Sequence, residues 1–184
     1  MVSALLIAAL AVQQQAALRL TPPAFDVASL RHRDGRMAPL MTAVRAMAAT
    51  PRIDGRLDDA AWVTAEPATD FRQRSPRDGD PATQRTEVRI LYDNEAVYVA
   101  ARMFDAEPAR IAAQLGRRDD LGASDNFAVA FDSYHDHLTS FLFYVNPLGV
   151  KMDFVASGDF GFGDPGWDPV WEVVTQRDSL GWTA

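Results

Sequence analysis

Trp167 and Trp171 are the residues best suited by type and spacing to bind a ligand, because they flank a short Asp-Pro pair. An exposed indole ring offers a flat apolar face on which another ring can stack. Phe160, Phe162 and Tyr144 are candidates to lie nearby and to widen that face. The alternative is that these side chains pack in a core or between domains. The pattern therefore predicts either a stacking site or a packing cluster in this region.

Patterns typical of catalytic and metal sites are weak. There is no cysteine, which excludes a thiolate zinc site and a cysteine nucleophile. The phosphate-binding Gly-Lys-Ser/Thr loop, Gly-x-Ser-x-Gly and His-Glu-x-x-His are missing from the sequence. His135-Asp136-His137 spaces two imidazoles as on a strand, but we interpret it as a hairpin turn because no third ligand is evident. With 25 Asp and Glu residues, any chosen carboxylate pair is uninformative, and we predict no catalysis in this chain.

Composition and charge indicate one folded domain with an acidic surface. The chain has 184 residues, of which 48% are hydrophobic and 10% aromatic, and a net charge of −7. These values suit a globular domain with a substantial core. The first fifty residues carry a net positive charge, whereas the remainder is strongly acidic. An acidic folded part disfavours nucleic acid as a partner and suits a cation such as calcium, or a neutral ligand.

The N-terminal third is expected to lie outside the folded module. An apolar run within residues 1–19 is too short to span a bilayer and fits the hydrophobic region of a secretory signal, although the usual positive segment before it is missing. We therefore expect residues 1–19 to be a signal peptide, with a buried helix as the alternative. Residues 20–49 carry Pro22-Pro23, a basic patch and weak periodicity, which predicts a linker.

Residues 50–184 alternate apolar and polar residues in short runs separated by turn residues, which is typical of antiparallel strands. Strands are expected at 86–93, 96–105, 126–133, 139–146, 150–157 and 170–176 after a short one near residue 52, with a short helix over 109–115. Val150, Met152 and Phe154 are expected to point inward. About seven strands with little helix predict an all-β fold, an antiparallel β-sandwich of the jelly-roll type.

One helical turn is expected after the Asp54-Gly55 turn. We expect Asp58 to cap it and Trp62 to be buried on its inner side. The carboxylates of this region could instead bind a cation. Asn146 is placed to start a type I turn that ends at Gly149.

Several sets of residues, in one order along the chain, carry a resemblance to a known family. They are Pro51-x-Ile53-Asp54-Gly55-x-Leu57-Asp58-Asp59-x-x-Trp62, Val88-Arg89-Ile90-Leu91-Tyr92-Asp93 with Val97-Tyr98-Val99, Ser124-Asp125-Asn126 with Phe131-Asp132, and Phe143-Tyr144-Val145-Asn146. Together they make residues 50–184 similar to the family 9 carbohydrate-binding module. The resemblance implies a β-sandwich that binds a poly- or oligosaccharide without catalysis and holds structural calcium, whose ligands the sequence does not indicate.

Sugar-binding positions of that family are mostly replaced here. Of five positions, one is kept, as Asn146. Gly122 stands where the family has a stacking tryptophan, Ala128 where it has a carboxylate and Tyr144 where it has an arginine. The second stacking tryptophan falls beyond the printed sequence. A carbohydrate site in this chain would therefore combine Asn146 and Tyr144 with the pair of tryptophans named at the outset, Trp167 and Trp171.

A narrower resemblance rests on four further sequences. They are Arg117-Arg118-Asp119, Asp132-Ser133-Tyr134-His135-Asp136, Asn146-Pro147-Leu148-Gly149 and Gly181-Trp182-Thr183-Ala184. They are similar to the N-terminal module of large exported bacterial proteins that continue into an outer-membrane-barrel-like domain of unknown function. This implies the periplasm or outer membrane of a Gram-negative bacterium, and a module lacking its last strands. The alternative function is a structural module that docks on its own missing barrel-like domain or on an envelope partner and binds no sugar.

Overall fold

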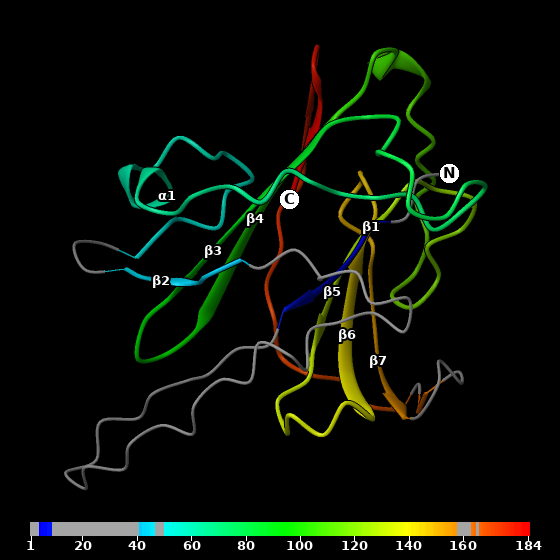
Figure 1. Cartoon of the computed structure of the whole chain (residues 1–184). Coiled ribbons are helices and arrows are strands. Elements are labelled where there is room, and N and C mark those ends of the chain that lie inside the picture. Colours follow the sequence, from blue (N-terminus) through cyan, green and yellow to red (C-terminus); the bar gives the residue numbers. More distant parts are fainter. Residues whose placement is uncertain (1–3, 9–40, 47–49, 158–162, 165) are drawn as a thin grey trace, which may run out of the picture.

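The computed structural model describes residues 4–8, 41–46, 50–157, 163–164 and 166–184, and its regular secondary structure is almost entirely β-strand (Figure 1). One sheet has the order β1-β5-β6-β7 and a second has the order β2-β3-β4-β9-β8; we call them the β6 sheet and the β4 sheet. The strands of the β6 sheet are β1 (Ala4–Ala8), β5 (Phe127–Phe131), β6 (Thr139–Val145) and β7 (Lys151–Ser157). Those of the β4 sheet are β2 (Val44–Arg45), β3 (Thr86–Tyr92), β4 (Val97–Phe104), β9 (Gly181–Thr183) and β8 (Gln176–Asp178).

Most neighbouring strands run antiparallel, and the expected all-β class is confirmed. The exceptions are two edge strands, since β1 pairs parallel to β5 and β2 pairs parallel to β3. Helical structure in the described residues is limited to α1 (Ala60–Val63) and one 3₁₀ turn, Pro108–Arg110. None of the helices described is long and apolar enough to cross a membrane.

A single core cluster joins the two sheets. Val88 and Ile90 of β3 and Ala101 of β4 pack with Phe127 and Val145 of the β6 sheet, and all five are buried. Because side chains alternate along a strand, burying every second residue against the other sheet leaves the residues between them on the outer face. The two sheets therefore form one packed unit with two outer faces.

The outer face of the β4 sheet is partly covered by the segment that contains α1. Trp62 is 4% exposed and packs with Ala65, Leu91 and Ala100, so its predicted burial is confirmed. Asp58, however, does not cap the helix. Asp59 occupies the N-cap position and makes no side-chain cap, because its carboxylate accepts hydrogen bonds from the backbone N–H and the guanidinium of Arg52.

Two predicted elements are not formed as expected. The helix over 109–115 is reduced to Pro108–Arg110, because the backbone beyond it bonds across to residues 124–125 instead of to itself: Asp125 donates to the Ala112 carbonyl, and Gln114 donates to the Ser124 hydroxyl. The strand at 170–176 is also missing from the described residues, and only Gln176–Asp178 joins a sheet, as β8.

The prediction that Met152 and Phe154 point inward is wrong. Phe143 of β6 pairs with Asp153 of β7, and Leu142 pairs with Phe154. Since Phe143 lies on the face toward the β4 sheet, Asp153 shares that face while Phe154 shares the opposite one. A charged residue thus takes an inner position, where it is 2% exposed.

Structure also extends into the segments expected to precede the module. Within the expected linker, Val44–Arg45 forms β2, and Met41 and Ala43 pack against the core. Within the expected signal peptide, Ala4–Ala8 forms β1. Packing of the described residues therefore begins before Thr50.

Candidate functional site

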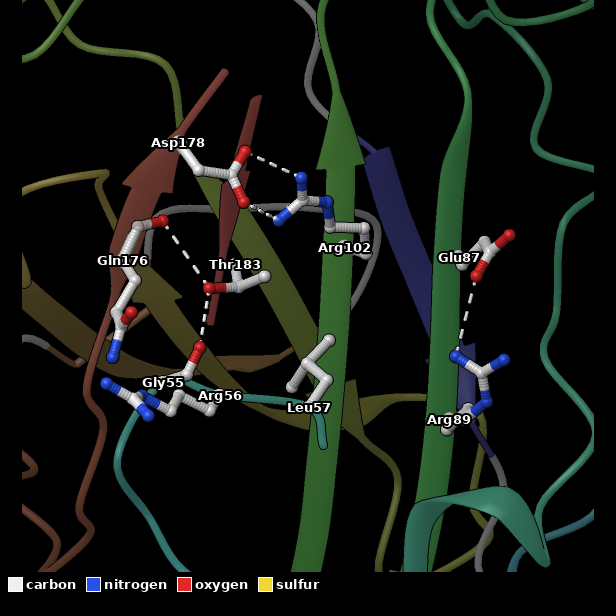
Figure 2. Close-up of a pocket in the computed structure, with 9 residues that line it drawn as sticks. All are labelled: Gly55, Arg56, Leu57, Glu87, Arg89, Arg102, Gln176, Asp178 and Thr183. Atoms are coloured by element: carbon white, nitrogen blue, oxygen red, sulfur yellow. Dashed lines mark hydrogen bonds and ion pairs between the residues drawn. The ribbon is translucent and has the colours of Figure 1, made fainter. Parts of the chain in front are cut away.

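A cavity of about 270 Å³ lies on the outer face of the β4 sheet, and Figure 2 shows the nine residues that line it. The side chains of a strand point alternately to its two faces, and this alternation determines which side chains line the cavity. Val88 and Ile90 point into the core, so Glu87 and Arg89 point outward from β3. Likewise Arg102 of β4 and Thr183 of β9 lie between residues that face the core. The cavity is therefore lined mainly by polar and charged groups.

Arg102 and Asp178 form a pair joined by two hydrogen bonds at this site. Nη1 and Nη2 of Arg102 donate to the two carboxylate oxygens of Asp178, each at 2.7 Å. The guanidinium lies 5.3 Å from the ring centroid of Phe104. The Arg102 hydrogen bonds, helped by the Leu180 backbone N–H, lower the pKa of Asp178 to about 2. Asp178 is thus ionised at neutral pH, and both of its oxygens are engaged.

Glu87 is shared between two arginines of the same strand region. It contacts the guanidinium of Arg85, and its other oxygen is 3.5 Å from Nη1 of Arg89. The Arg89 side chain is 25% exposed. One carboxylate therefore serves two guanidinium groups, and Arg89 keeps most of its N–H donors available.

The Asp54-Gly55 turn closes one side of the cavity. Gly55 has φ +75°, and a Cβ there would lie 2.8 Å from Cγ of Gln176 and 3.2 Å from the Val174 carbonyl oxygen. Thr183 donates its hydroxyl to the Gly55 carbonyl at 2.7 Å, and the Gln176 carboxamide donates to the Asp54 carbonyl at 2.7 Å. The predicted turn is thus confirmed, and β8 and β9 hold it in place.

Arg56 follows this turn and lines the cavity. Its backbone N–H donates to the Asp54 carboxylate, but among the described residues its guanidinium has no hydrogen-bond or ion-pair partner. In Figure 2 Arg56 lies beside Gln176 and Arg89 lies below Glu87, with Leu57 between the two arginines. The cavity thus offers guanidinium donors on two sides and an apolar surface between them.

Trp167 and Trp171 both pack in one aromatic cluster around Phe143. Their ring centroids lie 5.5 and 5.3 Å from that of Phe143, and Trp167 is also 4.9 Å from Phe141. Both tryptophans are half-buried. Tyr134, which is 69% exposed, continues the row at 5.9 Å from Phe141. We call these five side chains the aromatic row.

An ion pair between Arg118 and the buried carboxylate of Asp153 anchors this row to β7. Arg118 donates to Asp153 at 2.6 Å, and Trp171 donates its indole N–H to the same carboxylate oxygen at 3.0 Å. Arg118 also contacts Asp168, and Lys151 donates to the Trp171 carbonyl at 3.0 Å. These contacts attach the 167–171 segment to the β6 sheet, which explains why Trp171 is fixed in place.

Tyr144 and Asn146 do not join the two tryptophans. Tyr144 lies on the other face of the β6 sheet, stacked on Phe154 with centroids 5.7 Å apart, and burial raises the pKa of its hydroxyl. Asn146 is fully buried. Its amide donates to the Gln114 carbonyl and the Ser124 hydroxyl, and its oxygen accepts from two backbone N–H groups of its own turn. Phe160 and Phe162 lie outside the described residues.

The predicted metal residues find no common centre. His135 and His137 have ring centroids 4.8 Å apart in the β5–β6 loop, where both adopt left-handed backbone conformations, as the expected turn requires. His137 Nδ1 is 3.8 Å from Asp132. In the part of the chain that the structure describes, no three His, Asp or Glu residues gather closely enough to hold a metal ion, so the described residues assign no ligands to the calcium that the resemblance implies.

The cavity residues were missed by sequence reasoning because three distant segments supply them. One sequence pattern could have indicated the cavity. Glu87, Arg89 and Arg102 are charged residues at outward positions of strands whose inward residues are apolar. Comparison with family models, curated proteins and solved structures found no match to this chain.

Proposed function

We propose that this chain is a non-catalytic glycan-binding module that recognises a poly- or oligosaccharide in the cavity of the β4 sheet. One observation carries the proposal: planar side chains from β3, β4 and β8 are fixed in place and point into one cavity. The turn that β8 anchors adds Arg56 to them. Carboxylate, carboxamide and guanidinium groups each present two atoms that match neighbouring sugar hydroxyls.

Preorganisation supports binding at this site. Arg102 and Asp178 hold each other in one geometry, and Thr183 and Gln176 hold the turn that carries Arg56. Groups already fixed lose little conformational entropy when a ligand arrives. The Leu57 side chain supplies the apolar contact that the C–H face of a sugar ring needs.

The broader setting belongs to the same proposal. The two packed sheets would form a β-sandwich of jelly-roll type, and residues 1–19 would direct export to the periplasm or outer membrane of a Gram-negative bacterium. Structural calcium would be held as in the family 9 carbohydrate-binding modules that the sequence resembles. These statements rest on the sequence patterns.

A titration followed by amide NMR tests the proposal. The full chain is titrated with neutral and acidic oligosaccharides, and we expect saturable shifts concentrated at residues 55–57, 87–89, 102 and 176–183. Gln176→Ala removes the hydrogen bond that holds the turn carrying Arg56 and should weaken binding several-fold. Arg77→Gln, a change of an exposed residue in another loop, serves as the control and should bind like the wild type. A folded chain that shifts with no saccharide would contradict the proposal.

A docking module is the second candidate function, and the 167–175 segment favours it. Val170 is fully exposed and Val174 is 40% exposed on the same side of this segment. Among the described residues, no backbone hydrogen bond joins 167–174 to a neighbouring strand. An extended segment of this kind can accept a strand from a barrel-like domain or an envelope partner. Val170→Lys should then abolish association with the purified partner domain and leave saccharide titrations unchanged.

A further inference from the structure

We propose that the cavity of the β4 sheet binds an acidic glycan, in which successive sugar units carry carboxylates, through Arg56 and Arg89. The inference rests on the proposed function and names the substrate class of that site. Its starting point is a local excess of positive charge in a chain whose net charge is −7.

The charges around the cavity do not balance. Four guanidinium groups, those of Arg56, Arg85, Arg89 and Arg102, face two carboxylates, those of Glu87 and Asp178. Asp178 is fully engaged by Arg102, and Glu87 is divided between Arg85 and Arg89. Two positive charges are therefore left over.

The nearest further carboxylate does not neutralise them. Asp54 accepts the backbone N–H of Arg56 at 2.9 Å, and one of its oxygens is 3.9 Å from Arg52. No ion pair to the Arg56 guanidinium exists among the described residues. Among the arginines that line the cavity, Arg56 is therefore the cation most open to an incoming anion, and Arg89, whose contact with Glu87 is long at 3.5 Å, is the next.

The placing of the two arginines specifies the form of the ligand. A guanidinium binds a carboxylate through two parallel hydrogen bonds, which favours carboxylate over a hydroxyl as its partner. Figure 2 shows Arg56 and Arg89 on opposite sides of Leu57, which suits two separate carboxylates. An oligosaccharide with carboxylates on different units satisfies both arginines and lays a ring over Leu57.

Isothermal titration of the full chain at low salt tests this inference. The ligands are an oligogalacturonate and a neutral cello-oligosaccharide of the same length. We expect the acidic ligand to bind at least about tenfold more tightly, and its affinity to fall as salt is raised, because exposed charges are screened. Arg56→Gln is the main variant, since this guanidinium has no described partner whose loss would disturb the fold. It should weaken acidic binding about tenfold and leave the Tm unchanged.

Two controls keep the interpretation specific. Arg77→Gln removes an exposed arginine that pairs with Asp80 away from the cavity, and it should bind like the wild type. Poly-glutamate of matching charge tests for a general response to polyanions, and it should bind weakly because it has no sugar ring to lay over Leu57.

Each contrary result overturns a different statement. Equal affinity for neutral and acidic oligosaccharides would overturn the acidic class and leave glycan binding intact. Acidic binding that persists in the double variant Arg56→Gln/Arg89→Gln would overturn the assignment to these arginines. Tight binding of poly-glutamate would overturn a glycan as the ligand. A folded chain that binds no saccharide would overturn the proposed function itself.

Discussion

At the scale of single residues, the polar side chains that sequence patterns single out serve different purposes. Asn146 lies at the start of a turn and makes every hydrogen bond that its carboxamide can direct at the protein interior. A fully buried amide of this kind is not available to a ligand. Asp178, by contrast, is half exposed and fixed by Arg102 at the edge of a cavity, which is how a binding group is held ready.

Asn146→Ala should destabilise the fold and leave the cavity unaffected in the molecules that remain folded. The change leaves the Gln114 carbonyl and two turn N–H groups without their buried partner, at a cost of about 3 kcal/mol. Urea denaturation measures the loss. Asn94→Ala, at an exposed turn position, is the control and should change stability much less. A stable variant that has lost saccharide binding would mean that Asn146 acts as a ligand after all.

Asp178→Asn should reduce the acid sensitivity of the protein. The pKa of Asp178 is lowered to about 2 when folded, below its ordinary value. Its ion pair therefore stabilises the fold above about pH 4 and is lost as the pH falls through about 2. Thermal melts from pH 6 to pH 2 should show a steeper fall for the wild type than for the variant, whose Tm should already be lower at pH 6. Parallel curves would show that the titration of Asp178 contributes nothing to the acid sensitivity.

At the scale of elements, the turn before α1 and the hairpin of β8 and β9 build the cavity together. The turn carries Arg56, and the hairpin holds the turn through Thr183 and Gln176. Because the contacts cross between segments far apart in the sequence, a local change in the turn alters the ligand site on the sheet.

Gly55→Ala should lower stability and saccharide affinity together. A Cβ would be strained at φ +75° and would lie 3.2 Å from the Val174 carbonyl, for a combined cost of about 1–3 kcal/mol. Gly149→Ala is a matched control, since Gly149 has φ +79° but a Cβ there meets its nearest atom at 3.6 Å. Thermal melts and titrations of both variants separate the two effects. An equal loss in the two would mean that contact with β8 has no role.

Sequence patterns predicted most strands where apolar residues alternate, although the strand expected at 170–176 did not form, and they failed where distant partners decide. Val88, Ile90 and Ala101 mark the inner faces of β3 and β4 correctly. The inner face of β7 was misassigned because Asp153 is charged and only Arg118 and Trp171, far away in the sequence, make its burial acceptable.

The candidate site was harder to predict than the strands. Its residues meet only because β9 enters the sheet between β4 and β8, and no local pattern encodes that neighbour. Trp167 and Trp171 pack on Phe143, and the anchoring of Trp171 to Asp153 could not be anticipated from their spacing.

At the scale of the whole molecule, the shared core predicts that both sheets unfold together. Ile90 lies in the β4 sheet and is 2% exposed, in a cluster that includes residues of β5 and β6. Ile90→Ala should cost about 2–5 kcal/mol, and hydrogen exchange should accelerate as much in β6 as in β3. Val63→Ala, at an 85% exposed position, should change neither. Acceleration confined to the β4 sheet would show two independent units.

The position of β9 also dictates an order of events during synthesis. β3 and β4 pair with each other early, but β4 must wait for Gly181–Thr183 before its second edge is filled. The entire β5–β6–β7 meander emerges from the ribosome in the interval. Throughout that time β4 presents an open edge to any other extended chain, as edge strands generally do. A nascent chain of this protein should therefore depend on holding chaperones until β9 is made, and stalled translation before Gly181 should favour aggregation.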